Sequence, residues 1–186
     1  MSKRSNPKVA LIGIGNILFL DEGLGIYLIE YIKVNFKAPP NLTILDGSGL
    51  GFGLMPYFEE YDYVILVGTT SSTKAKAGEI FIYSVDDILN QGTVKKTATE
   101  AELTMMLEIC ALNDYRAEIK FISMVPKNII DVKNGLTPQV LKAMPNLLER
   151  VLVELEKLNI KLEPKNSLSF SKVIERVCGI ENIREI

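Results

Sequence analysis

Short apolar runs alternate along the chain with longer segments whose apolar residues recur every three or four positions. The short runs, at residues 8–14, 42–45, 63–67, 79–84 and 118–124, are rich in branched residues, as buried strands are. Helical spacing marks residues 25–36 and 99–112, and a third helix is expected from Thr137 onwards. Strands and helices in this alternation predict crossover connections. We therefore expect an α/β fold, a three-layer sandwich with a mainly parallel twisted sheet of about five strands and helices on both faces.

The third helix has a clear start signal, because Thr137 offers a capping hydroxyl and Pro138 suits the first helical position. Pro145 is expected to kink or divide this helix, since proline removes a backbone donor. Its predicted buried face consists of Val140, Met144, Leu148, Val151 and Leu155.

The chain is long enough, at 186 residues of which 47% are apolar, to bury one substantial core. We expect residues 1–158 to form the main domain. Beyond Asn159 the sequence turns polar, and the apolar residues Val173, Ile174 and Val177 then come before Gly179. This pattern predicts that residues 159–186 form a C-terminal appendage with a short helix that stops at the glycine.

Composition excludes several classes of function. A net charge of −2 gives no footprint for nucleic acid, and every apolar run is shorter than the roughly 20 residues that cross a bilayer. Residues 1–8 lead into a strand instead of a secretory signal, so a cytoplasmic protein without a membrane partner is expected. Cys110 and Cys178 are the two cysteines and are predicted to be buried free thiols. The chain has no histidine, so its chemistry must work without imidazole.

Three glycine-rich loops follow predicted strands, at residues 13–25, 46–53 and 68–78. In an open α/β sheet, ligands bind at the carboxyl ends of the strands, so these loops are the candidate site. Dinucleotide binding is not favoured. The third glycine of the GxGxxG fingerprint that begins at Gly13 would fall at position 18, which is Leu18.

Several motifs, taken together and in order, are similar to those of the hydrogenase maturation protease family. They are GIGNILFLDEGLG at residues 13–25, LDGSGLG at 45–51, VILVGTT at 64–70 followed by Gly78, and VPKNIIDVKNGLTPQVLKAM at 125–144. The resemblance spans residues 8–158, and several motifs in register are far more specific than one short match.

The resemblance implies an endopeptidase that removes a C-terminal tail from the large subunit of a nickel-iron hydrogenase, so the expected partner is that large-subunit precursor. Members of the family hold a metal through a glutamate, an aspartate and a histidine. The corresponding positions here are Glu22, Gly68 and Thr99. Glycine and threonine lack the nitrogen, thiolate or carboxylate donors that a divalent transition ion needs. We therefore expect no tightly bound cofactor, and any nickel to come with the substrate.

The candidate catalytic residues are Glu22, which is also the remaining metal position, and Asp46 in the second loop. Each has a structural alternative. Glu22 would be an ordinary acid in the first turn of a helix, where the helix dipole favours it. Asp46, which precedes Gly47 and Gly49, would form a turn by bonding its own main chain.

The other residues predicted to line the cleft are Asn16, Asp21, Gly47, Gly49, Thr69 and Glu100. Asp21 would instead cap the first helix, and Glu100 would be a helix-start acid favoured by the dipole. Cys110, a conceivable replacement ligand, shares an apolar stripe with Leu103 and Leu107, which favours a place in the core.

Two hypotheses remain open from the sequence. The protein is either a divergent maturation endopeptidase that uses Glu22, with the metal supplied by its substrate, or a binding protein that recognises a hydrogenase precursor or another partner without cleaving it. Whether the chain is an enzyme is therefore left undecided by its residues.

Overall fold

The computed structural model describes residues 6–71, 74–90, 97–112 and 117–179. Its strands are β1 Val9–Gly13, β2 Phe36–Lys37, β3 Leu42–Asp46, β4 Tyr63–Thr69, β5 Ile80–Ser84, β6 Glu118–Met124 and β7 Glu163–Pro164. Its α-helices are α1 Leu24–Asn35, α2 Met55–Glu60, α3 Val85–Asn90, α4 Ala98–Leu112, α5 Pro138–Lys157 and α6 Phe170–Val177. Two 3₁₀ turns, η1 Leu20–Gly23 and η2 Gly51–Leu54, precede α1 and α2.

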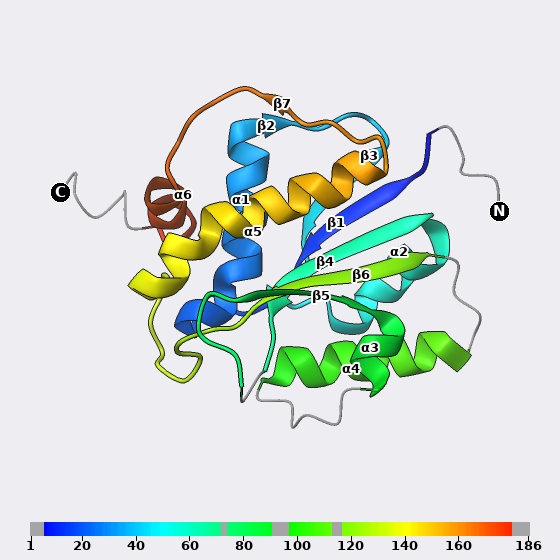
Figure 1. Cartoon of the computed structure of the whole chain (residues 1–186), viewed down its shortest axis with the longest axis horizontal. Coiled ribbons are helices and arrows are strands. Elements are labelled where there is room, and N and C mark those ends of the chain that lie inside the picture. The colour runs from blue at the N-terminus through cyan, green and yellow to red at the C-terminus, as the bar shows by residue number, and fades with distance from the viewer. Residues whose placement is uncertain (1–5, 72–73, 91–96, 113–116, 180–186) are drawn as a thin grey trace.

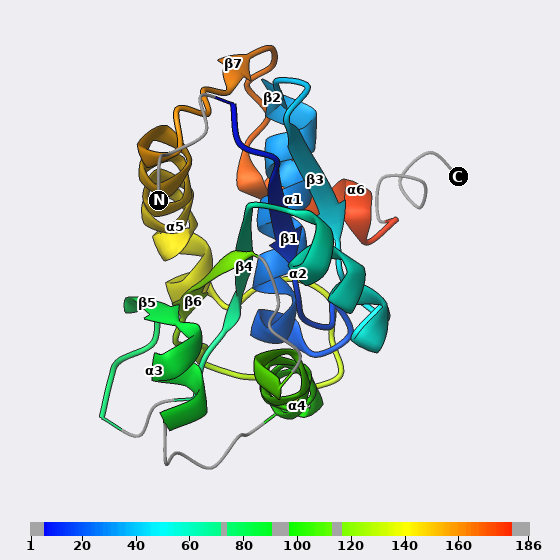
Figure 2. The same ribbon diagram turned by 90° about the vertical axis from the view of Figure 1, so that its right-hand side faces the viewer.

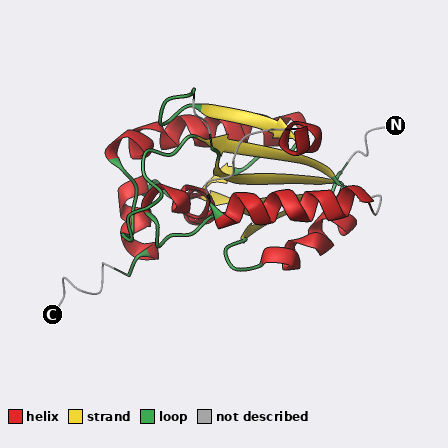
Figure 3. Cartoon of the chain, turned by 90° about the horizontal axis from the view of Figure 1, so that it is seen from below, coloured by secondary structure: helices red, strands yellow, loops and turns green. Residues whose placement is uncertain are grey.

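The five-stranded sheet has the order β3-β1-β4-β6-β5, with β5 antiparallel to β6 and the other pairs parallel. Helices α1, α5 and α6 cover one face, and α2, α3 and α4 cover the other (Figures 1 and 2). Seen from below, the strands lie between the two groups of helices (Figure 3). The predicted three-layer α/β fold is confirmed.

Two apolar clusters, one on each side of the sheet, hold the layers together. Central strands contribute to both, because alternate residues of a strand point to opposite faces. Val9 and Leu11 belong to the cluster under α1 and α5, and Ala10 and Ile12 to the cluster over α2 and α4. Cys110 is buried in the second cluster and free, as predicted. Burial raises the pKa of its thiol, which keeps it protonated and inert.

Pro145 does not divide α5, which runs unbroken from Pro138 to Lys157, so that alternative is wrong, whereas a kink at Pro145 stays a prediction. Pro145 is exposed, so its ring faces solvent, and the helix is held by the apolar face on its other side. That face includes Leu147, which is fully buried, whereas Leu148 is only partly buried.

The segment after α5 packs against the first helix. Asn35, at the end of α1, donates from Nδ2 to the Leu168 carbonyl and accepts from the Leu168 N–H, at 3.1 and 2.7 Å. The Phe170 ring stacks on Tyr31 at 3.8 Å, and Ile174 enters the core. The predicted short helix is α6. The division at residue 158 stays a prediction.

Cys178, which follows α6, is free but only partly buried, so the prediction of a buried thiol is wrong for this residue. Its Sγ lies 3.5 Å from the hydroxyl of Tyr27, which also accepts a hydrogen bond from the Gly135 N–H at 3.0 Å. Burial raises the pKa of Tyr27, so its hydroxyl stays neutral. In the part of the chain that the structure describes, no helix is long and apolar enough to cross a bilayer.

Candidate active site

The carboxyl ends of β1, β3, β4 and β6 meet at one edge of the sheet, where η1 brings Asp21 and Glu22 up against the strand ends. Gly15 makes this approach possible. Its φ is 140°, and a Cβ there would lie 2.0 Å from the Glu22 carbonyl oxygen. Asn16, from the predicted cleft set, donates its N–H to that carbonyl at 3.3 Å and accepts from the Leu18 N–H at Oδ1. Asn16 therefore shapes the loop.

Asp21 is fully buried, and its carboxylate accepts four hydrogen bonds from the segment between β6 and α5. The N–H groups of Lys127, Asn128 and Thr137 donate at 2.9, 2.9 and 2.7 Å, and the Thr137 hydroxyl donates at 3.0 Å. The prediction that Asp21 caps the first helix is therefore wrong, as is the capping role of the Thr137 hydroxyl. Both side chains instead fasten two distant segments together.

Glu22 is also buried, at 6% exposure, but has one side-chain partner. The Thr99 hydroxyl, from the first turn of α4, donates to Glu22 Oε1 at 3.0 Å. The fold thus brings together two of the three positions that the resemblance assigned to metal ligands, from segments 77 residues apart.

Gly68, the third position, lies near the carboxyl end of β4. A Cβ built there would meet Ile14 Cγ1 at 2.8 Å, the Ile14 carbonyl oxygen at 3.1 Å and a ring carbon of Phe121 at 3.4 Å. The space next to this glycine is therefore already filled. The residue paired with Gly68 on the neighbouring strand β6 is Ser123. Its fully buried hydroxyl has no hydrogen-bond partner within the residues described.

These residues do not fit a resident transition metal. The three positions that the resemblance assigned to metal ligands hold one carboxylate, one hydroxyl and one glycine, and such an ion requires more nitrogen, thiolate or carboxylate donors than this. Across the described ranges, no group of three or more histidine, cysteine, aspartate or glutamate side chains is placed to hold an ion.

Asp46 ends β3, and its Oδ1 accepts from the Ser48 N–H at 2.7 Å. The predicted turn-forming role is confirmed, whereas a catalytic role for Asp46 stays a prediction. Gly49 has a φ of 71°, which glycine adopts without strain. Gly47 and Gly49 line a small cavity of about 40 Å³ together with Thr99.

Glu100 lies in the first turn of α4, where the sequence placed it, and is buried at 8% exposure. Its carboxylate accepts from the Ser71 N–H at 2.6 Å and from the Ser71 hydroxyl. The contact ties the segment after β4 to α4. Thr69 ends β4, is buried and pairs with Met124. Ser71 was not predicted, because nothing in its local sequence indicates a partner 29 residues away.

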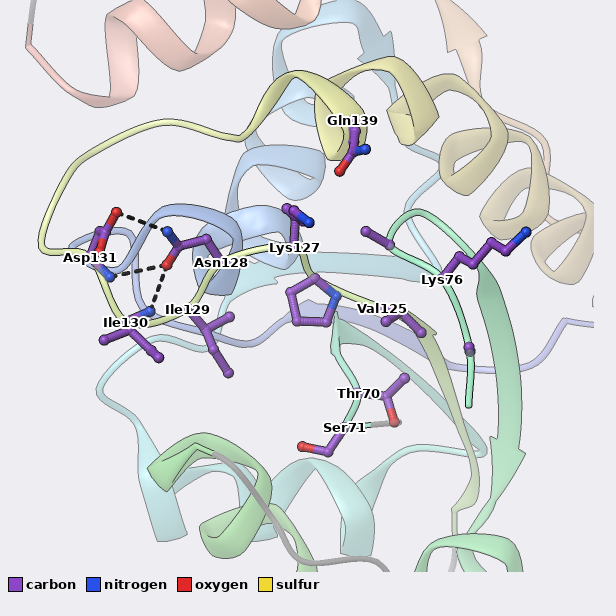
Figure 4. A pocket seen from close by; sticks show the side chains of 13 residues that line it. Thr70, Ser71, Lys76, Val125, Lys127, Asn128, Ile129, Ile130, Asp131 and Gln139 are labelled. Carbon is purple, nitrogen blue, oxygen red and sulfur yellow. Dashed lines mark hydrogen bonds between the residues drawn. The ribbon is translucent and has the colours of Figure 1, made fainter. Parts of the chain in front are cut away.

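A cavity of about 1030 Å³ opens beside Ser71, and Figure 4 shows the side chains around it. Two segments form most of its wall, Thr70 and Ser71 after β4 and residues 125–131 after β6, and residues 75–77 and Gln139 complete it. Lys127 and Asn128 are among the lining residues that Asp21 holds. No residue of 125–131 was predicted as a site residue, although the segment belongs to a motif that resembles the family.

The hydrogenase maturation protease family model matches residues 26–154, more than two thirds of the chain. The chain belongs to the hydrogenase maturation protease family. Protein HydD of Wolinella succinogenes is 25% identical over 150 residues, which cover 79% of this chain and 94% of HydD. The hydrogenase 2 maturation protease of Escherichia coli is 24% identical over 162 residues, which cover 87% of this chain and 98% of that protein.

Solved structures of the family share the fold. The hydrogenase maturating endopeptidase HybD from E. coli superposes with a TM-score of 0.78 at 24% identity, covering 85% of this chain and 98% of HybD. The resemblance recognised in the sequence motifs is therefore confirmed. The roles of individual residues at the site stay predictions.

Proposed function

We propose that this protein removes the C-terminal tail of a nickel-iron hydrogenase large subunit, and that any metal taking part is already held by that substrate. The observation that carries the proposal is the cavity of about 1030 Å³, whose wall residues Lys127 and Asn128 are bonded to Asp21, the neighbour of Glu22, in a chain of this family. A cavity at the carboxyl ends of the strands is where an α/β sheet binds its ligand.

Glu22 is the group that we assign to the chemistry. Thr99 engages Oε1, and within the described residues Oε2 accepts no hydrogen bond. The fixed carboxylate therefore has one oxygen that can bind a group of the substrate or take up a proton from an attacking water. Thr99 orients the carboxylate so that this oxygen has a defined direction.

A second function is recognition of the same precursor without cleavage. It is favoured by a specific observation: the slot beside Gly68 is filled by Ile14, and Thr99 offers Glu22 a hydroxyl instead of a nitrogen donor. A protein that once oriented a metal and no longer does so retains its binding surface, because that surface is built mainly by other residues.

The deciding experiment is incubation of the purified chain with unprocessed large subunit, in nickel-loaded and nickel-free forms. We expect mass spectrometry to show loss of the tail from the nickel-loaded form only. Glu22→Gln should abolish this loss, whereas Glu156→Gln, at an exposed position on α5, should leave it unchanged.

Binding measured in parallel separates the two functions. A precursor that binds the chain but keeps its tail under every condition supports recognition without cleavage. A precursor that is neither bound nor cut overturns both functions.

A further inference from the structure

The segment 126–136, between β6 and α5, has no regular secondary structure, yet the fold holds it at several points. Asp21 makes three hydrogen bonds to it: its carboxylate accepts from the N–H groups of Lys127 and Asn128, and its own N–H donates to the Asn128 carbonyl at 3.1 Å. Further along, the Lys133 carbonyl accepts from Leu20, and the Lys133 N–H donates to Leu18, both at 2.9 Å. Residues 126–131 of this segment are therefore a preformed wall of the cavity.

The wall also has internal bonds. Asn128 Oδ1 accepts from the N–H groups of Ile130 and Asp131 at 3.0 and 3.1 Å, and Asn128 Nδ2 donates to Asp131 Oδ2 at 2.8 Å (Figure 4). These contacts hold the backbone that carries Ile129 and Ile130. Binding here does not have to order the wall first, which lowers the entropic cost of association.

The wall presents apolar side chains to the cavity. Ile129 points from the loop into the space before Ser71, and Val125 and Pro126 extend the apolar surface (Figure 4). Ile130, on the rim, is 82% exposed. Single exposed apolar residues are common, but apolar residues gathered on a fixed wall of a cavity are typical of a ligand site.

The charged groups of the lining favour a carboxylate. Lys127 and Lys76 belong to it, and its acid, Asp131, is already bonded to Asn128. Lys127 forms no ion pair with any residue that the structure describes, although its backbone is fixed by Asp21. The cavity is also at the upper end of the roughly 300–1,000 Å³ of small-molecule pockets, which leaves room for a peptide segment.

We propose that this cavity binds an extended peptide segment of the substrate, with an apolar side chain against Ile129 and a carboxylate at Lys127. The carboxylate belongs either to an acidic side chain or to the free end of the peptide. The proposal rests on the proposed function and names the chemistry of the tail that the site selects. Asp21 is the positioning residue that joins this subsite to Glu22.

The test measures binding of a fluorescein-labelled hexapeptide with two central leucines, one glutamate and a free C-terminal carboxylate to the full chain, by fluorescence anisotropy. Ile129→Asp should weaken binding about tenfold or more, because it places a charge in the apolar part of the subsite. Lys127→Gln should weaken it about two- to fivefold, as expected for an exposed ion pair.

Two further peptides identify the source of the carboxylate. Amidation of the peptide's C-terminus should lower its affinity by the same factor as Lys127→Gln does. Combining the amidated peptide with the Lys127→Gln variant should lower the affinity no further. If amidation has no effect but replacing an acidic side chain does, the carboxylate is a side chain, and the subsite stands. Both results support the proposal.

Leu112→Asp is the matched control, because Leu112 is 85% exposed and lies outside the cavity. The Leu112→Asp variant should bind the peptide with the same affinity as the unmodified chain. Equal affinities for the Ile129→Asp variant and this control overturn the subsite. If the precursor is still processed in that case, the proposed function stands. If the peptide binds as expected but the precursor is neither bound nor cut, the subsite stands and the proposed function falls.

Discussion

Asp21 and Glu22 are consecutive buried acids on one turn, but their surroundings differ. Asp21 is surrounded by four donors, three of them backbone N–H groups. Within the described residues, the side chain of Glu22 has one hydroxyl partner, Thr99, and the space beside Gly68 is already filled by Ile14. The first acid has every partner that a structural carboxylate needs, whereas the second lacks the partners that a metal ligand needs.

The difference shows that the frame of the site and its metal chemistry rest on separate residues. Backbone donors depend on the fold and tolerate change in other side chains, whereas a metal site depends on the identity of three side chains. A chain can therefore keep the backbone contacts around Asp21 whichever residues stand at the three positions that the resemblance assigned to metal ligands.

The largest effect is expected at Asp21. Asp21→Ala leaves three N–H groups and a hydroxyl without their acceptor and should lower the free energy of unfolding by about 3–5 kcal/mol. Glu22→Ala should cost about 1 kcal/mol, since it removes one hydroxyl contact. Urea unfolding of both variants measures the two losses.

Asp21→Asn tests the positioning role, because its amide keeps one acceptor oxygen. It should fold, bind the leucine hexapeptide more weakly and raise KM for the precursor more than it lowers kcat. Equal costs for the alanine variants at Asp21 and Glu22 contradict the comparison.

The second effect concerns metal affinity. The unmodified chain, given excess nickel or zinc and then desalted, should retain less than one equivalent. Gly68→Asp with Thr99→His should raise the affinity by about 100-fold or more, because two missing ligands are restored. The gain requires the Ile14 side chain to move, as it would otherwise meet the new Cβ.

Elemental analysis after equilibrium dialysis measures the metal content, with each single variant as control. A stoichiometric ion in the unmodified chain that is lost in Glu22→Gln would mean that other groups complete the site. A double variant that binds no more metal than either single variant would show that the assignment of positions is wrong.

A third effect isolates the filled slot. Gly68→Ala should cost about 1–3 kcal/mol of stability, because the added methyl overpacks the contact with Ile14. Gly53→Ala is the matched control: its nearest neighbour would be 3.8 Å away, so its cost should be much smaller. Thermal unfolding compares the two, and equal costs would mean that the slot is not filled in solution.

The smallest effect concerns Glu154, a buried acid that is held by cations instead of backbone donors. Burial by itself raises its pKa, but Lys157 and Lys120, bonded at 2.5 and 3.1 Å, outweigh burial and hold the pKa below the ordinary 4.5. A lowered pKa in the folded state stabilises the fold above pH 4.5, and this contribution is lost as the pH falls through the folded pKa.

Glu154→Gln should therefore cost about 1 kcal/mol at pH 7, because both lysines are partly exposed, and it should flatten the loss of stability below pH 4.5. Chemical unfolding at pH 7 and pH 3 provides the measurement, with Glu156→Gln as control. An unchanged pH dependence would show that the lysines do not stabilise the charged form.

Much of this molecule could be predicted from local pattern. The β6 strand has the predicted bounds, and the other predicted strands and helices differ by one or two residues at their ends. The short helices α2 and α3 and the β2-β7 pair were not predicted, since their few residues carry no complete period. The Thr137 hydroxyl was predicted to cap α5. That prediction failed because the local sequence could not reveal that the hydroxyl binds Asp21 instead.

The amino-acid sequence by itself determined the layered fold and the family, because apolar periodicity and residue identity are local properties. Tertiary structure alone decided that Asp21 fastens the wall of the cavity, that Ser71 meets Glu100, and that Ile14 fills the slot beside Gly68. These contacts join residues far apart in the chain, so they exist only once the strands have been brought side by side.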